Sequence, residues 1–170
     1  MYLFRPFWAA VTALCLMIGA ANGQVDGTPA GPVILTVSGL NEADFPGGQV
    51  HFDIDILRAM GEVEIETSSI WTDGTHVYTG VLLKDLVETL KIGAGLLRLR
   101  ALNDYAVEFP AHEAGDDGPI LAYWSDGKPM PVRDKGPVWL IYPYDSKAEY
   151  RTDTAYSRSI WQLDRIEVLR

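Results

Sequence analysis

The sequence predicts a single α+β domain built from mixed, mainly antiparallel sheets. Segments with period-two alternation outnumber segments with helical spacing. Tight turns separate several of the expected strands, which favours antiparallel pairing over a parallel sheet wound by helices. The sequence also contains no glycine-rich nucleotide loop and no nucleophile elbow, so no motif argues for a doubly wound fold.

The first 23 residues are predicted to be a secretory signal peptide. Arg5 precedes an apolar stretch over 7–21, and Ala21-Asn22-Gly23 offers small residues where a signal peptidase cleaves. The stretch is 15 residues long, shorter than the roughly 20 that span a bilayer, although an uncleaved anchor is the alternative. We expect cleavage after Gly23, then a flexible tether over 24–32 that is rich in turn residues, then one domain over 33–170.

The first half of the domain is expected to alternate short strands and one helix. Residues 33–37 are β-branched and apolar enough for a strand, and residues 45–48 contain Pro and Gly of a turn. Asp53 is placed to cap a short helix over 54–60 that carries apolar residues on one side. Residues 62–66 then alternate strictly between acidic and apolar side chains, which predicts a half-buried strand.

The clearest helix is expected over 82–90, where leucine and valine recur at helical spacing. Lys91 would favour its negative C-terminal end, and Gly93 is placed to stop it. Beyond this helix the alternation returns to period two. Strands are expected over 97–101, 106–109, 120–124, 138–142 and 161–168.

Charge and cysteine content exclude several classes of function. The 14 basic and 23 acidic residues give a net charge of −9, which would repel a phosphate backbone, so we expect no nucleic-acid partner. Cys15, the single cysteine, lies within the predicted signal peptide. The mature chain would therefore have no disulfide, cysteine nucleophile or cysteine zinc site, which fits a periplasmic or secreted protein.

Side chains that could hold a metal or form a hydrolase site are poorly arranged in the sequence. The three histidines have no spacing that places two imidazoles on one metal. Glu113, Asp116 and Asp117 are expected to form a solvated acidic loop, since the regular alternation of a calcium loop is missing. Ser68 lies near His76 in sequence, but without geometry this predicts no hydrolase.

Three turns combine polar side chains with an aromatic residue: residues 71–74, 103–105 and 133–139. Such turns present hydrogen-bonding groups and flat apolar faces to a heteroaromatic, phosphate-bearing ligand. The alternative is that the aromatics belong to the core and the polar pairs only form turns. Composition and spacing alone favour that alternative.

An ordered series of segments extends from about Val33 to the C-terminus, over 64–71, 78–86, 103–105, 121–130, 136–143 and 159–161. The series resembles the oxidoreductase molybdopterin-binding domain of the sulfite oxidase type, especially its small exported single-domain members. The resemblance implies mixed sheets around a pterin cofactor cleft. We expect the cofactor-binding residues to be Thr67, Trp71, Asn103, Asp104, Tyr105, Arg133, Lys135 and Arg158.

Two positions depart from the pattern of that family. Thr67 stands near the position of the cysteine thiolate that binds molybdenum in catalytic members, and a neutral hydroxyl is a much poorer ligand. Trp139 stands where the family's Gly-x-Pro-x-Arg segment supplies an anion-binding arginine. Arg133, Lys135 or Arg158 would have to compensate. We therefore expect no molybdenum bound through a protein thiolate, no other protein metal site, and no identifiable catalytic residue.

The expected function is binding of a pterin or another small anionic ligand without sulfite-oxidase chemistry, as a sensor or accessory subunit. Trp71, Asn103, Tyr105, Lys135 and Arg158 are expected to converge on one cleft. One alternative is an active molybdopterin-dependent oxidoreductase with oxygen or water ligands on the metal. Another is a periplasmic protein-interaction module whose surface patch includes three tyrosines, Tyr142, Tyr144 and Tyr150.

Overall fold

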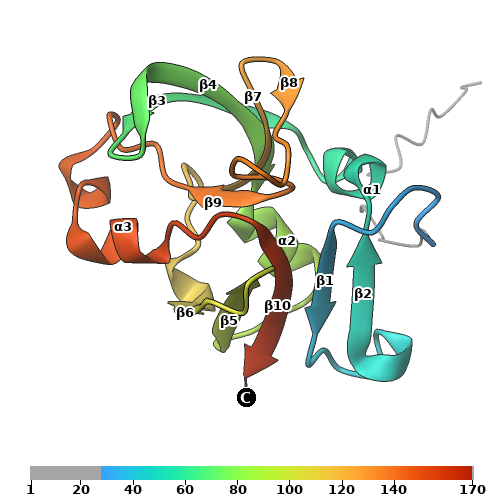
Figure 1. The fold of residues 1–170 in the computed structure, drawn as a ribbon. Coiled ribbons are helices and arrows are strands. Elements are labelled where there is room, and N and C mark those ends of the chain that lie inside the picture. Colours follow the sequence, from blue (N-terminus) through green and yellow to red (C-terminus); the bar gives the residue numbers. More distant parts are fainter. Residues whose placement is uncertain (1–27, 170) are drawn as a thin grey trace, which may run out of the picture.

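The computed structural model describes residues 28–169, which contain ten strands and three α-helices (Figure 1). The predicted signal peptide and residues 24–27 of the predicted tether lie outside the described residues. Within the described part of the chain, no helix is long and apolar enough to span a bilayer. Three single-turn 3-10 helices connect the larger elements: η1 (Pro46–Gly48), η2 (Ala111–Glu113) and η3 (Ala148–Tyr150).

The first sheet contains five strands in the spatial order β2-β1-β10-β5-β6. These are β2 (Gln49–Phe52), β1 (Leu35–Ser38), β10 (Leu163–Leu169), β5 (Leu96–Ala101) and β6 (Ala106–Pro110). The contact between β1 and β10 is parallel, whereas the other three contacts are antiparallel. The first strand of the domain therefore pairs with its last.

The second sheet is antiparallel throughout the described residues. Its main path is β3-β4-β7-β8, and β9 also pairs with β7. The strands are β3 (Val63–Ser69), β4 (Thr72–Leu82), β7 (Ile120–Ser125), β8 (Lys128–Pro129) and β9 (Trp139–Ile141). The prediction of one domain with mixed, mainly antiparallel sheets is confirmed at this level of description.

The helices are short and lie in the connections. The predicted helix after Asp53 is α1 (Ile54–Ala59), and the Asp53 carboxylate accepts a hydrogen bond from the Ile56 N–H at 2.9 Å. The clearest predicted helix is α2 (Leu83–Thr89). The sequence did not predict α3 (Asp153–Arg158), because it has six residues and buries only Ala155. A helix with one buried residue gives too little apolar periodicity to be predicted from the sequence.

The C-terminal end of α2 differs from the prediction. Gly93 was expected to stop the helix, but the chain leaves it at Lys91, whose φ is +52°. The N–H of Ile92 donates to the Val87 carbonyl at 2.9 Å, and the N–H of Lys91 donates to the Glu88 carbonyl at 3.0 Å. These two bonds form a Schellman motif, in which the left-handed position is usually glycine. In this helix the left-handed position is occupied by a lysine.

The predicted turn over 71–74 is also shorter in the structure. Only Ile70 and Trp71 lie between β3 and β4, so Thr72, Asp73 and Gly74 belong to the 11-residue strand β4. Gly74 has φ of +75°, and the pairing register shifts between Ser68 and Ser69. The Asp-Gly signal therefore marks an irregularity within a hairpin, which glycine permits. The strand β2 was not predicted, and β10 begins at Leu163, two residues after the predicted start.

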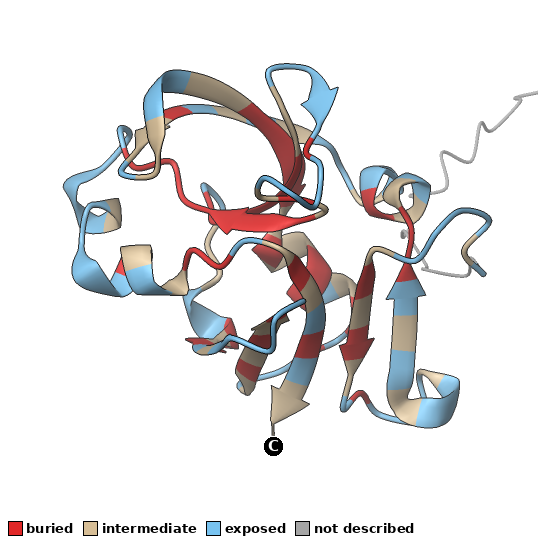
Figure 2. Cartoon of the chain, in the orientation of Figure 1, coloured by how far each residue is buried: buried red, intermediate tan, exposed pale blue. Residues whose placement is uncertain are grey.

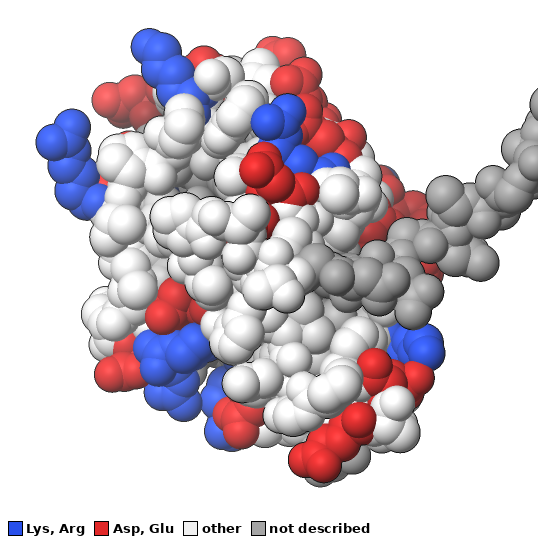
Figure 3. Space-filling view, turned by 90° about the vertical axis from the view of Figure 1, so that its right-hand side faces the viewer, with Lys and Arg blue, Asp and Glu red and all other residues white. Residues whose placement is uncertain are grey.

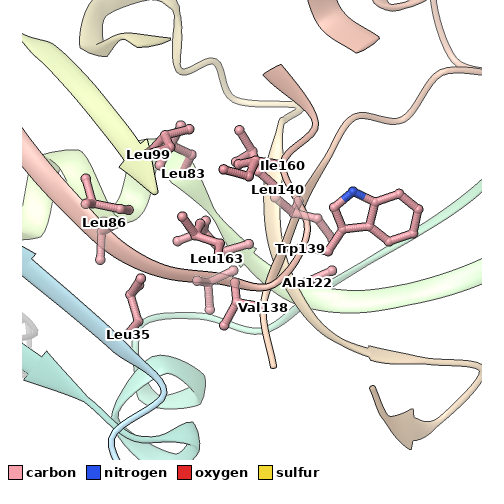
Figure 4. Packing of buried hydrophobic residues seen from close by; sticks show 14 of the residues in the cluster. Leu35, Leu83, Leu86, Leu99, Ala122, Val138, Trp139, Leu140, Ile160 and Leu163 are labelled. Carbon is pink, nitrogen blue, oxygen red and sulfur yellow. The ribbon is translucent and has the colours of Figure 1, made fainter. Parts of the chain in front are cut away.

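The core lies where the two sheets meet. Buried residues concentrate in β9, in the second half of β4 and in α2 (Figure 2). Leu140 joins a group of aliphatic side chains, whereas the indole of Trp139 points away from that group (Figure 4). This alternation along β9 gives Trp139 a different set of neighbours, which includes the rings of Trp71 and Tyr78.

Candidate functional site

A pocket of about 380 Å³ lies where the β3–β4 hairpin, the β5–β6 turn and the segment from α3 to β10 meet. We call it the aromatic pocket, because four of its lining residues carry aromatic rings. The hairpin brings Trp71 to it, and the segment after α3 brings Trp161. The complete lining is Trp71, Ala101, Asn103, Tyr105, Tyr156, Ser157, Ser159, Ile160 and Trp161.

Trp71 is the centre of the aromatic contacts. Its ring meets those of Tyr156 and Trp161 with centroid distances of 5.8 and 5.6 Å, at interplanar angles of 86° and 71°. It also meets Trp139 at 5.9 Å and 67°. These edge-to-face contacts are the arrangement that the ring quadrupoles favour. The walls of the pocket are therefore close to perpendicular to one another.

The polar side chains of the pocket already make internal hydrogen bonds. Asn103 Oδ1 accepts a bond from the Tyr105 N–H at 3.1 Å, which shapes the turn between β5 and β6. The Ser157 and Ser159 hydroxyls donate to the carbonyls of Thr154 and Ala155 at 2.9 and 2.8 Å. The described residues contribute no charged side chain to the lining. Ring faces are consequently the main binding groups of this pocket.

Three of the eight predicted binding residues, namely Trp71, Asn103 and Tyr105, line the aromatic pocket. The neighbouring Asp104 carboxylate instead contacts the Arg165 guanidinium at 3.0 Å. Arg133 is exposed and is absent from the lining.

The two cations expected in the same cleft point elsewhere. Arg158 Nη1 lies 2.6 Å from Glu113 Oε2, and the guanidinium covers the ring of Phe109 at 5.2 Å. Lys135 Nζ lies 3.3 Å from Asp134 Oδ1 and 5.5 Å from the centroid of the Trp139 ring. The structure therefore does not bring all five expected residues to one cleft, because ion pairs and cation–π contacts hold these two cations away.

Thr67 is fully buried, and its hydroxyl is engaged with the main chain on both sides. The Oγ1 atom donates to the Ser68 carbonyl at 3.1 Å and accepts from the Asp145 N–H at 3.2 Å. The Asp145 carboxylate in turn accepts from the Ser68 N–H at 2.6 Å and from the Ser68 hydroxyl at 2.9 Å. These bonds tie β3 to the loop after β9. A hydroxyl used in this way does not fit the role of a metal ligand.

A second pocket of about 310 Å³, which we call the polar pocket, contains Lys135 and Trp139. His76 lies at its edge, with Nδ1 2.7 Å from Asp126 Oδ2 and Nε2 3.0 Å from the Asp73 carbonyl oxygen. The contact with Asp126 raises the pKa of His76 above its ordinary value. The lining residues are Thr72, His76, Tyr78, Ser125, Asp126, Lys128, Pro129, Met130, Pro131, Asp134, Lys135 and Trp139.

Tyr78 carries an unpaired hydroxyl within the polar pocket. The residue is 1% exposed, and its oxygen finds no hydrogen-bond partner among the described residues. Burial raises the pKa of this hydroxyl. Sequence reasoning missed Tyr78 as well as Tyr156 and Trp161. Trp161 belongs to segment 159–161 of the series that resembles the family, which could have marked it as a binding residue. It was instead interpreted as the first residue of a strand.

The acidic residues that were expected to form a solvated loop pair with separate basic partners. Asp116 pairs with Lys84 at 2.9 Å, and Asp117 contacts Lys147 and accepts from the Tyr150 hydroxyl at 2.6 Å. Over residues 28–169, no three His, Cys, Asp or Glu side chains lie close enough to hold a metal ion. On the face shown in Figure 3, basic side chains are scattered and form no continuous area.

Comparison with known proteins identifies no family for this chain. No family model matches the sequence, and no curated protein matches it. The geometry of the two pockets is therefore the basis for inferring function.

Proposed function

We propose that this chain is a ligand-binding domain without redox chemistry, and that the aromatic pocket is its binding site. The observation that carries this proposal is the gathering of four aromatic side chains from three separate chain segments around one pocket. Two of them remain accessible, since Tyr105 is 55% exposed and Trp161 is 38% exposed. Exposed rings around a concave site are typical of small-molecule binding.

The ligand class that these rings favour is a planar heterocycle such as a pterin. Ring faces and edges offer stacking contacts, and burying accessible aromatic area stabilises a complex by about 25 cal/mol per Å². The pterin itself follows from the family resemblance, whereas the preference for a flat ring follows from the lining. The lining supplies no cation for a phosphate. The lining therefore supports binding of the ring of the expected ligand but provides no partner for its anionic group.

The proposal excludes molybdenum held by this chain, because the residues at the family's ligand positions do not fit the metal. The Thr67 hydroxyl is buried and bonded to the main chain on both sides. Trp139, in the place of the anion-binding arginine, is buried and donates its indole N–H to the Ser159 carbonyl at 3.2 Å. A neutral hydroxyl and an indole replace a thiolate and a guanidinium. We therefore infer no sulfite oxidation.

A fluorescence titration of the protein with pterin tests the proposed site. We expect pterin to quench tryptophan emission with saturation, and we expect Tyr105→Leu to weaken binding at least threefold. Ile70→Ala is the matched control, because Ile70 is 64% exposed beside Trp71 but does not line the pocket. Equal weakening by both variants would argue for a nonspecific apolar surface, and absence of saturation would overturn the proposal for pterin.

A protein-interaction module is the second candidate, and one observation favours it. Ile70 and Leu102, which are 64% and 44% exposed, are apolar residues that are adjacent in sequence to lining residues of the aromatic pocket. The tyrosine patch expected from the sequence does not form, because Tyr142 and Tyr144 are buried. For a protein partner, Ile70→Ala and Leu102→Ala should weaken binding as strongly as Tyr105→Leu, and pterin should not compete.

A further inference from the structure

The electrostatic surroundings of the aromatic pocket are unusual for an anion site. No basic side chain of the described residues lines it. The two arginines that flank Trp161 in the sequence are both paired with carboxylates. Arg158 lies 2.6 Å from Glu113, and Arg165 contacts Asp104 and Asp164 at 3.0 and 3.1 Å. The whole chain has a net charge of −9. An anion would therefore enter without a partner in the lining, whereas a cation would be attracted by the long-range field.

The rings provide what a cation needs at close range. The negative faces of Trp and Tyr attract a cation placed over them, and nearly perpendicular walls allow several faces to contact one group. Trp71 stands at 86° to Tyr156 and at 71° to Trp161. Tyr105 and Trp161 keep part of their surface accessible. The pocket thus combines several aromatic walls with a neutral lining.

The hydrogen bonds of the lining residues distinguish a primary ammonium from a methylated ammonium as a ligand. A primary ammonium has three N–H donors that need acceptors once water is removed. The lining side chains offer few acceptors for three donors: Asn103 Oδ1 already accepts from the Tyr105 N–H, Ser159 Oγ also contacts the Tyr144 hydroxyl, and Ser157 Oγ retains its lone pairs while donating to the Thr154 carbonyl. A methylated ammonium has no such donors and contacts ring faces through its methyl groups. The lining therefore favours the methylated cation.

We propose that the aromatic pocket selects ligands that carry a quaternary ammonium group, which deepens the proposed binding function and rests on it. The ring walls supply the cation–π attraction, and the acidic chain supplies the long-range attraction. Any flat part of the ligand would then contact the remaining aromatic surface.

Calorimetric titration with choline and with its uncharged carbon isostere, 3,3-dimethylbutan-1-ol, tests this inference. The two probes have the same shape, so a preference for choline isolates the charge. We expect choline to bind at least about tenfold more tightly, as cation–π contacts of this number would give. At position 161, choline affinity should fall in the order Trp, Phe, Leu, whereas binding of the alcohol should change little.

Asn103→Asp provides an independent variant with minimal structural change. It retains the oxygen that accepts the Tyr105 N–H and adds a negative charge at the pocket. Choline should bind several-fold more tightly to this variant, and the alcohol should not. Should Trp161→Leu fail to fold, as judged by circular dichroism, the Asn103→Asp comparison and Tyr105→Leu replace it.

The outcomes separate this inference from the proposed function. Equal binding of choline and the alcohol, or tighter binding of the alcohol, would overturn the quaternary ammonium preference while leaving the pocket as a binding site. No binding of choline by any form of the protein would also overturn it, and saturable pterin binding would then still support the proposed function. Absence of binding by choline, the alcohol and pterin would reject both.

Discussion

The two ring nitrogens of His76 face two acceptors, Asp126 Oδ2 at 2.7 Å and the Asp73 carbonyl oxygen at 3.0 Å. Only the imidazolium donates to both at once, since a neutral ring has one N–H. The contact with Asp126 accordingly raises the pKa of His76, and the same contact lowers the pKa of Asp126. Asp126 Oδ1 also accepts from the Val77 N–H at 3.0 Å. The pair thus joins β4 to the β7–β8 turn.

The stabilisation from the His76–Asp126 pair should decrease both at high pH and at low pH. Because the folded pKa of His76 is raised, its contribution is complete below the unfolded value of about 6.5 and is lost as pH rises through the folded value. Because the folded-state pKa of Asp126 is lowered, its contribution to stability is complete above the unfolded-state pKa. This contribution is lost as the pH falls through the folded-state pKa. In an NMR titration, His76 should titrate above its ordinary value, and Asp126→Asn should lower its midpoint.

The control for this pH dependence is the stability of His76→Gln. The difference in urea midpoint between the native chain and this variant should be larger at about pH 6 than at about pH 9. A stability difference that stays constant across that range would contradict the role assigned to His76.

Thr67 should matter for stability rather than for metal binding. Thr67→Val keeps the shape of the side chain but removes the hydroxyl that accepts from Asp145 and donates to Ser68. Losing this partly buried hydrogen bond from the Asp145 N–H should cost about 0.5–1.5 kcal/mol of unfolding free energy. Thr67→Ser retains the hydroxyl and deletes one methyl group, so it should cost less. Urea denaturation measures both, and equal losses would assign the effect to the methyl group.

Local chemistry made several elements of this fold predictable. The strict alternation over 62–66 identified β3, and the Asp53 cap identified α1, because in both cases neighbouring residues determine the structure. The end of α2 was mispredicted because Lys91, and not Gly93, adopts the left-handed conformation that local propensity assigns to glycine. β4 continues across Asp73 and Gly74 because Thr72 still pairs with Ser69, and the register shift between Ser68 and Ser69 places the Asp-Gly pair in an irregularity of the strand and not in the turn itself.

The candidate site was predictable only in part, for a related reason. Trp71, Asn103 and Tyr105 share a turn chemistry that places aromatic and polar groups at strand ends, and the structure places all three in one pocket. The directions of Lys135 and Arg158 depend on which carboxylate lies closest in space. The partner of Arg158 is Glu113, which is 45 positions away and gives no signal in the sequence. The direction of a long charged side chain can therefore be predicted only when the three-dimensional fold is known.

Gly80 and Gly93 should respond in opposite ways to alanine. A Cβ at Gly80 would lie 2.3 Å from the Leu121 carbonyl oxygen, which is fixed in a paired strand, whereas a Cβ at Gly93 would meet nothing within 4 Å. Gly80→Ala should therefore lower the unfolding free energy by about 1–3 kcal/mol or more. Gly93→Ala should be neutral or stabilising by up to about 1 kcal/mol. Thermal and urea denaturation of both variants test the contrast, and a neutral Gly80→Ala would show that the strands can separate.

Tyr78 provides the sharpest test of the polar pocket. Its hydroxyl is buried without a hydrogen-bond partner among the described residues, a condition that costs about 1–3 kcal/mol. Tyr78→Phe removes this cost and keeps the ring, which meets Trp139 edge-to-face at 5.4 Å. The variant should be as stable as the native chain or more stable, by up to about 2 kcal/mol.

The matched control for Tyr78→Phe is Tyr144→Phe, because Tyr144 is equally buried but its hydroxyl contacts the Ser159 hydroxyl. Loss of that hydrogen bond should destabilise the protein by about 0.5–1.5 kcal/mol. The two variants delete the same atom from the same residue type, so their opposite signs isolate the hydrogen bond from the packing of the ring. If Tyr78→Phe instead lowered stability as much as Tyr144→Phe, the Tyr78 hydroxyl would have to bond a water molecule or the neighbouring Thr72 side chain, whose contact opposes the rise in the pKa of Tyr78.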